Sequence, residues 1–167
     1  MSPDINIILC CIAMGPSAEW VMLHALQEAG VHGAKVHVLH VIPAYDATMA
    51  MPIVSFMGEE KFSQLVKEHK DETVVAIKKD IEELKERIIK EHLDESVDRI
   101  RNIHVYEGDP ELEILHMADE LGVDMIVMGT HSKGLTQYTF MGSVAKKVLK
   151  RSRVPMLLVP PLTAVTR

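Results

Sequence analysis

Residues 127–144 read Val-Met-Gly-Thr-His-Ser-Lys-Gly-Leu-Thr-Gln-Tyr-Thr-Phe-Met-Gly-Ser-Val, and they join an apolar, strand-like run to an amphipathic, helix-like run. Gly129 follows the strand and can turn the chain sharply, because a residue without a Cβ tolerates positive φ. Gly142 and Ser143 open the helix, where free backbone N–H groups and the helix dipole favour an anion. A strand, a glycine-bearing loop and a helix N-terminus in this order predict a phosphate-binding cradle.

The same alternation of strand and helix continues over the rest of the chain. Short apolar runs, typical of strands buried on both faces of a parallel sheet, occupy residues 6–12, 34–42, 102–106, 124–128 and 154–159. Amphipathic runs between them predict helices at 17–29 (closed by Gly30), 59–93, 110–121 and 142–151. The pattern predicts an α/β fold: a five-stranded, mainly parallel open sheet with helices on both faces, Rossmann-like.

Residues 44–58 interrupt this alternation. They contain Pro52, Gly58 and three methionines, Met49, Met51 and Met57. Proline and glycine both disfavour a helix interior, so we expect a long, mobile, apolar surface loop here. The helix that follows, from Glu59 to about Leu93, is highly charged and is expected to be kinked or in two pieces. Its apolar stripe consists of Leu65, Val74, Ile77, Ile81, Leu84 and Ile88.

Composition limits the class of protein. The chain has 167 residues, of which 47% are hydrophobic, and this suits a single domain over 1–167 with a core at about 4–160 and a tail at 161–167. A net charge of -6 argues against nucleic acid as the main partner. No apolar run approaches the length of a membrane span, so we expect no membrane contact and a cytoplasmic protein. The adjacent Cys10 and Cys11 are expected to be buried structural thiols.

The order of motifs resembles that of the universal stress protein family, small α/β domains related to adenine-nucleotide α-hydrolases. The resemblance covers about residues 4–160. It rests on Val-Leu-His-Val-Ile at 38–42, Gly-Asp-Pro at 108–110, Asp-Met-Ile-Val-Met-Gly-Thr-His at 124–131, Gly-Ser-Val at 142–144 and Val-Pro-Met-Leu-Leu-Val at 154–159. It implies an adenine nucleotide, ATP with Mg²⁺, as the ligand, and a homodimer formed through the strand at 154–159.

The resemblance also suggests which residues bind the nucleotide. Adenine would lie against the backbone of Val41 and the loop after the first strand, and ribose near Gly129. The phosphates would meet backbone amides around Ser132 and at the start of the last helix. His131 could hydrogen-bond either a phosphate or a loop carbonyl. The candidate binding residues are Ile12, Ala13, Val41, Met128, Gly129, His131, Ser132, Gly142, Ser143 and Val144.

Two positions depart from the pattern of nucleotide-binding members. Ser132 replaces the second loop glycine, and a Cβ there costs about 1–2 kcal/mol if the position needs positive φ. Ala13 replaces an aspartate near the ribose and removes a charge-assisted hydrogen bond of about 1.5–3 kcal/mol. Together these amount to about 2.5–5 kcal/mol, or roughly two to four decades in affinity.

Motifs of catalysis are missing from the sequence. No Gly-Lys-Ser/Thr follows the glycine loop, and there is no Gly-x-Ser-x-Gly or convergent carboxylate pair, so no catalytic residue is assigned. The histidines show no tight metal-ligand spacing, so no metal site is predicted and His37, His40, His104 and His116 are read as surface or satisfied core groups. The leading hypothesis is an ATP-binding regulatory protein of the stress response. The alternatives are a nucleotide-independent dimeric interaction module and a hydrolase of an adenine-containing substrate.

Overall fold

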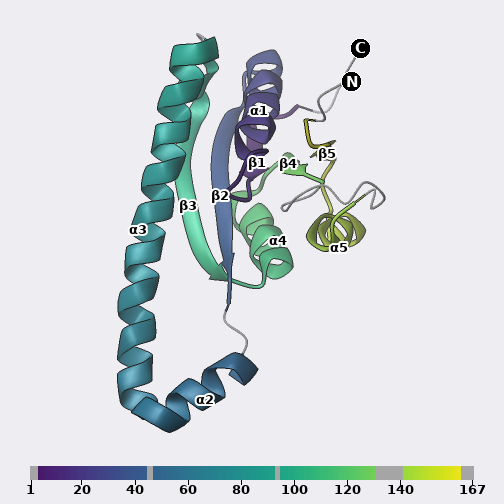
Figure 1. The fold of residues 1–167 in the computed structure, drawn as a ribbon. Helices are drawn as coiled ribbons and strands as arrows, with labels where there is room; N and C mark the ends of the chain where they lie inside the picture. The colour runs from purple at the N-terminus through teal and green to yellow at the C-terminus, as the bar shows by residue number, and fades with distance from the viewer. Residues whose placement is uncertain (1–3, 45–46, 93–94, 131–140, 163–167) are drawn as a thin grey trace.

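Five parallel strands form the centre of the molecule. The computed structural model describes residues 4–44, 47–92, 95–130 and 141–162. The strands are β1 (Ile7–Cys11), β2 (Lys35–Pro43), β3 (Ile100–Gly108), β4 (Met125–Gly129) and β5 (Met156–Val159). They lie side by side in the order β3-β2-β1-β4-β5, and all four neighbouring pairs are parallel (Figure 1). The predicted five-stranded α/β fold is therefore confirmed.

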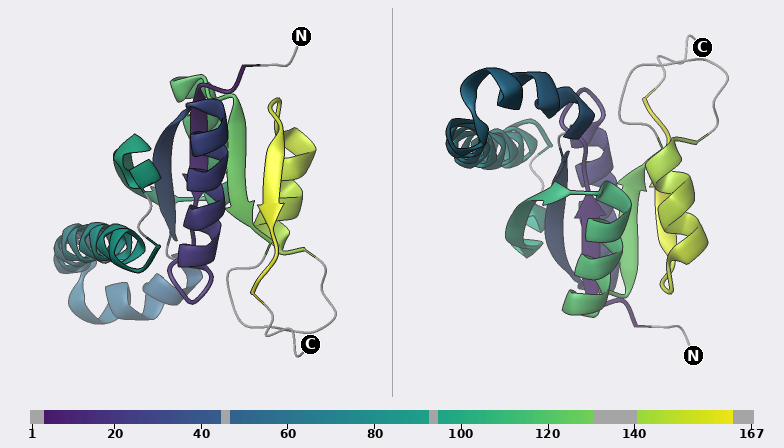
Figure 2. Two further views of the ribbon diagram at one scale, coloured as in Figure 1. Left: turned by 90° about the horizontal axis from the view of Figure 1, so that it is seen from above. Right: turned by 90° about the horizontal axis from the view of Figure 1, so that it is seen from below.

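Helices cover both faces of this sheet. The helices α1 (Ala18–His32) and α3 (Glu59–His92) and the 3-10 turn η1 (Glu95–Arg99) pack on one face. The helices α4 (Pro110–Leu121) and α5 (Ser143–Arg151) pack on the other. Figure 2 shows this division, since α1 lies in front of the sheet in one view and α4 in the opposite view. Each face has its own buried apolar cluster, with β1 contributing to both.

Residues 44–58 are not the predicted loop, because Ala47–Met57 form the helix α2. Alanine and methionine, which recur in this segment, are strong helix formers. Their preference outweighs the cost of Pro52, which lies inside the helix. Gly58, at φ +88°, takes the left-handed conformation between α2 and α3. Figure 1 shows α2 at the far end of α3, beyond the carboxyl ends of the strands.

The charged segment that follows forms one helix of 34 residues. At 1.5 Å per residue α3 is about 51 Å long, whereas a nine-residue strand such as β3 spans about 30 Å. The C-terminal half of the predicted stripe is buried, namely Ile81, Leu84 and Ile88. Leu65, nearer the start, is 52% exposed, because this part of α3 extends past the sheet.

The C-terminal ends of α4 and α1 can be compared with the glycines that were predicted to end them. Gly122, at φ +59°, ends α4 as predicted. Gly30 does not end α1, which continues to His32 and stops at Gly33 with φ +71°. Among the described helices, none is both long and apolar enough to cross a membrane.

Candidate functional site

A pocket of about 420 Å³ opens at the carboxyl ends of the central strands. The strand order reverses between β1 and β4, and ligands of open parallel sheets bind at such a reversal. The volume falls within the roughly 300–1,000 Å³ usual for small-molecule sites. The pocket is lined by Cys11, Ile12, Ala13, Met14, Ser17, Ala18, Val21, Leu39, His40, Val41, Pro43, Pro110, Ile114, Met128, Gly129, Thr130, Gly142, Ser143, Val144 and Ala145.

Eight of the ten predicted binding residues line this pocket: Ile12, Ala13, Val41, Met128, Gly129, Gly142, Ser143 and Val144. The other two, His131 and Ser132, lie outside the described residues. The described lining contains no Asp, Glu, Lys or Arg side chain. An apolar interior with few polar groups suits a flat heteroaromatic ring better than a highly charged ligand.

The loop after β1 is fixed against β2 by two hydrogen bonds. The Ile12 N–H donates to the Leu39 carbonyl at 3.0 Å. The His40 Nδ1 lies 2.8 Å from the Ile12 carbonyl oxygen, and a carbonyl only accepts, so Nδ1 carries the hydrogen. His40 thus holds the mouth of the pocket, although sequence reasoning treated it as an ordinary core or surface histidine. Only the pairing of β1 with β2 brings the two residues together.

The backbone of Val41 faces the pocket. Leu39 lies two residues before Val41 on β2, and its carbonyl points toward Ile12 at the end of β1. Backbone groups of a strand alternate in direction, so the N–H and C=O of Val41 point the same way. The last register pair of β1 with β2 is Cys11 with Leu39. Val41 therefore presents both groups where β1 has already ended.

The first turn of α5 forms the opposite side of the pocket. Gly142 is the N-cap, with φ -64° and ψ 158°, and no side chain caps the helix. The Gly142 N–H is already used, since it donates to the Thr130 carbonyl at 2.6 Å. The amides of Ser143, Val144 and Ala145 have no partner within the helix, because the first turn of any helix lacks one. Ala145 was not among the predicted residues, although its place in the first turn follows from the same rule.

Of the two glycines of the cradle, Gly129 differs from the prediction in conformation, whereas Gly142 opens the helix as predicted. Gly129 does not turn the chain at positive φ, because it is the last residue of β4 and pairs with Val159. Gly142 is extended, a conformation open to any residue. Backbone geometry therefore does not require glycine at 142.

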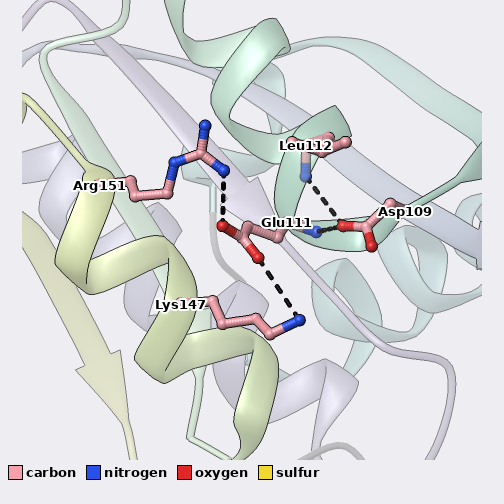
Figure 3. Close-up of polar contacts among 5 residues, drawn as sticks. All are labelled: Asp109, Glu111, Leu112, Lys147 and Arg151. Atoms are coloured by element: carbon pink, nitrogen blue, oxygen red, sulfur yellow. Dashed lines mark hydrogen bonds and ion pairs between the residues drawn. The ribbon is translucent and has the colours of Figure 1, made fainter.

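Ion pairs and a cap hold α4 against α5 beside the pocket (Figure 3). The Asp109 carboxylate accepts hydrogen bonds from the N–H groups of Glu111 at 2.9 Å and Leu112 at 3.2 Å. The Glu111 carboxylate, whose side chain is 13% exposed, reaches Arg151 at 2.8 Å and Lys147 at 3.6 Å. This contact joins the first turn of α4 to α5.

The fold and the pocket define a class of protein: a parallel α/β domain with a small-molecule site at the reversal of strand order. Residues 5–160 match the model of the universal stress protein family, and the chain belongs to that family.

Two relatives from Methanocaldococcus jannaschii illustrate the match. The chain is 32% identical over 139 residues to universal stress protein MJ0531, and this match covers 81% of this chain and 71% of that protein. It is 29% identical over 143 residues to universal stress protein MJ0577, covering 86% and 87%.

Solved structures show the same fold. The structure of MJ0577 superposes with a TM-score of 0.71 at 24% identity, over 97% of this chain and 100% of that one. A universal stress protein in complex with cAMP superposes with a TM-score of 0.52 at 17% identity, over 95% and 98%.

Proposed function

We propose that this universal stress protein binds an adenine nucleotide, ATP with Mg²⁺ in the first instance, and acts as a nucleotide-responsive regulator of a stress response in the cytoplasm. One observation carries the proposal. An apolar pocket of about 420 Å³ lies at the reversal of strand order and ends at the N-terminus of α5, whose N-cap residue, Gly142, has no side chain to cap the helix. Apolar walls suit a base, and the free amides suit phosphate. The cAMP complex of a family member supports the adenine nucleotide as ligand class.

Adenine would lie between Ile12, Ala13 and Val41. The Val41 N–H and C=O form a donor and acceptor pair that can read the edge of the base without any particular side chain. Ile12 is 4% exposed and provides apolar contact for the ring. The described lining has no charged side chain, so no fixed charge in it would act on the base or the ribose.

The phosphates would meet the amides of Ser143, Val144 and Ala145. The positive end of the α5 dipole favours negative charge at this place. No carboxylate is present among the described lining residues, so Mg²⁺ would arrive on the phosphates rather than in a protein cage. The Ser143 hydroxyl is the side-chain oxygen of the first turn that could reach such an ion.

The first test asks whether nucleotide is present at all. Purified full-length protein is denatured, and released nucleotide is identified by chromatography and mass. The stripped protein is then titrated with ATP, ADP and AMP, with and without Mg²⁺, while thermal stability is followed. A ligand at 100 times its Kd should stabilise the fold by about 2.7 kcal/mol. No released nucleotide and no thermal shift at millimolar ATP would refute the proposal.

The second test uses Gly142→Val. The backbone at this position accepts any residue, so the variant should fold. Its side chain enters the space that the phosphates would occupy, and we expect the thermal shift to vanish. Gly30→Val, at an exposed site in α1, is the matched control and should keep the shift. Unchanged binding by Gly142→Val would contradict the phosphate assignment.

A homodimer through residues 154–159 is a second proposal, and the strand edge favours it. The carbonyls of Pro155 and Val159 accept hydrogen bonds from β4. Strand alternation then directs the backbone groups of Leu157 toward β4 and those of Met156 and Leu158 away from it. The outward groups of β5 can pair with the same strand of a second copy. Such a dimer could also serve a nucleotide-independent interaction module.

Sedimentation velocity tests this dimer with two proline variants. Leu158→Pro removes an outward N–H and should yield a folded monomer. Leu157→Pro removes an N–H directed at β4, and should instead lower the stability of the fold. A wild-type monomer, or a dimer that Leu158→Pro leaves intact, would count against pairing through β5.

A further inference from the structure

Two histidines far apart in sequence meet on the outer part of the sheet. His37 on β2 and His104 on β3 are 67 residues apart, and neither had a metal-like spacing in sequence. A register shift between Val36 and His37 brings them together, because Val36 pairs with Ile100 but His37 pairs with Asn102. The extra residue on β3, Arg101, reverses which side chains of that strand face each side. Without it, residue 104 would lie on the face opposite His37.

The imidazole rings of the pair point at each other through nitrogen. The His37 Nδ1 and His104 Nε2 are 3.2 Å apart. The rings are inclined by only 19°, and their centroids are 5.5 Å apart. This separation equals the nitrogen–nitrogen distance plus about two ring radii, so the contact runs in the planes of the rings. One nitrogen must donate and the other accept, which requires at least one neutral imidazole.

The surroundings keep both imidazoles neutral at ordinary pH. Burial lowers the pKa of His37, and His104 and Lys35 lower it further. Burial also lowers the pKa of His104, while the Glu120 carboxylate on α4 opposes this and Lys78 reinforces it. Both rings remain partly accessible to solvent. A neutral, accessible imidazole is the form that binds a metal.

We propose that His37 and His104 form a two-histidine site for a divalent transition-metal ion that prefers imidazole, with Zn²⁺ as the reference ion. Two nitrogens bonded to one tetrahedral Zn²⁺ at about 2.0–2.1 Å lie about 3.3–3.4 Å apart. The observed 3.2 Å is close to this separation. Because the two nitrogens now face each other, both rings must turn so that their lone pairs converge on the ion.

The remaining coordination positions belong to solvent. Among the residues that the structure describes, no three His, Cys, Asp or Glu side chains converge as a ready-made metal centre. The charge of Glu120 favours positive charge at His104, whereas Lys35 and Lys78 disfavour it at the pair. This site is separate from the nucleotide pocket, whose lining includes neither histidine.

Calorimetric titration of the metal-stripped full chain with ZnCl₂ tests the site. We expect saturation at one equivalent in wild type. His37→Gln and His104→Gln should each weaken binding by at least about tenfold, the lower end of what losing even a supporting contact costs. His69→Gln, on exposed α3, is the matched control and should bind like wild type.

Two further readouts keep the result independent of folding defects. Zinc should raise the thermal midpoint of wild type and His69→Gln, but not that of His37→Gln or His104→Gln. Nitrogen-15 spectra of the imidazoles should show Zn²⁺ shifting His37 and His104 first. Equal isotherms for all four proteins, or shifts confined to other histidines, would overturn the proposal.

Discussion

Ala13 is the residue at which the proposed nucleotide site departs from the family pattern near adenine and ribose. It lines the pocket at the end of β1 and is half-buried. The family pattern has an aspartate here. We predict that Ala13→Asp tightens ATP binding by about 1.5–3 kcal/mol, or roughly 10- to 150-fold, because a carboxylate can accept hydrogen bonds from ribose hydroxyls. The measurement is the Kd by calorimetry.

The control for this variant is the ligand rather than another residue. 2′,3′-Dideoxy-ATP has no ribose hydroxyls to donate, so its affinity should not rise in Ala13→Asp. An equal gain for both nucleotides would show that the new charge acts on something other than ribose.

Asp124 joins two strands that are distant in sequence. Its Oδ2 accepts hydrogen bonds from the N–H groups of Asn6 at 2.8 Å and Ile7 at 3.0 Å. Removing a charged acceptor leaves both donors without this partner, so Asp124→Ala should lower the free energy of unfolding by about 1.5–3 kcal/mol. Denaturant titration measures the loss. Asp80→Ala, at an exposed site in α3, should change stability much less.

At the residue level, sequence reasoning located residues whose place follows from the order of helices and strands, while their binding roles stay predictions. Ser143 and Val144 lie in the first turn of a helix, and Val41 near a strand end, so their backbone groups could be placed in advance. His40 could not, because its partner Ile12 is 28 positions away and is reached only through strand pairing. The positive φ expected of Gly129 was wrong, because pairing with Val159 keeps it in the sheet.

At the scale of elements, the contact between α4 and α5 is held by Glu111. We predict that Glu111→Gln lowers stability by about 0.5–1 kcal/mol, since each partly exposed ion pair is worth about 0.2–1 kcal/mol. The loss should shrink in 1 M salt, where the screening length is about 3 Å. Urea titrations at low and high salt measure it.

The matched control is Glu83→Gln on α3. Its pair with Lys79 is 3.5 Å long, and both side chains are more than half exposed. This substitution should have a smaller effect at either salt concentration. An equal loss of unfolding free energy in both variants would mean that the ion pairs of Glu111 do not stabilise the packing of α4 on α5.

Element boundaries were predictable where apolar periodicity and caps agree. Asp109, Pro110 and Gly122 bracket α4 at the ends expected from sequence. The loop predicted for the segment of α2 was wrong. Pro52 and Gly58 are typical of a break in a helix, but the helix preference of the alanines and methionines prevails. The bounds expected for α3 agree with the structure, which has one helix over Glu59–His92 rather than two pieces.

At the scale of the whole molecule, the thiols report on global unfolding. Cys10 and Cys11 lie on the central strand, 0% and 7% exposed. Burial raises the pKa of Cys10 to about 12 and that of Cys11 well above its usual range. We predict that neither reacts with a disulfide reagent at pH 8 in the native protein, because the reactive species is the thiolate.

Both thiols should react once denaturant unfolds the chain. The rate in native buffer should follow the rate of unfolding measured by circular dichroism. A fast reaction of Cys10 without unfolding would show that the sheet opens locally at β1, whereas a fast reaction of Cys11 alone would show access through the pocket that it lines.

The global arrangement was the most predictable level. Five apolar runs separated by amphipathic ones leave few topologies for a parallel sheet. The register shift at Arg101 was not predictable, because a single added residue leaves no hydrophobic signature. It decides which side chains of β3 face α4, and so the histidine pair could be found only in the structure.

The central place of β1 also orders events during synthesis. β1 is the first of the strands to be made, but its contact with Asp124 spans 117 residues. At about 5–20 residues per second, that partner follows about 6–24 s later. The chain up to Gly108 can meanwhile form β1, β2 and β3, but not the wall of the pocket made by β4 and α5. A ligand of this pocket can therefore stabilise the chain only after β4 and α5 have been made, and not the nascent chain before that.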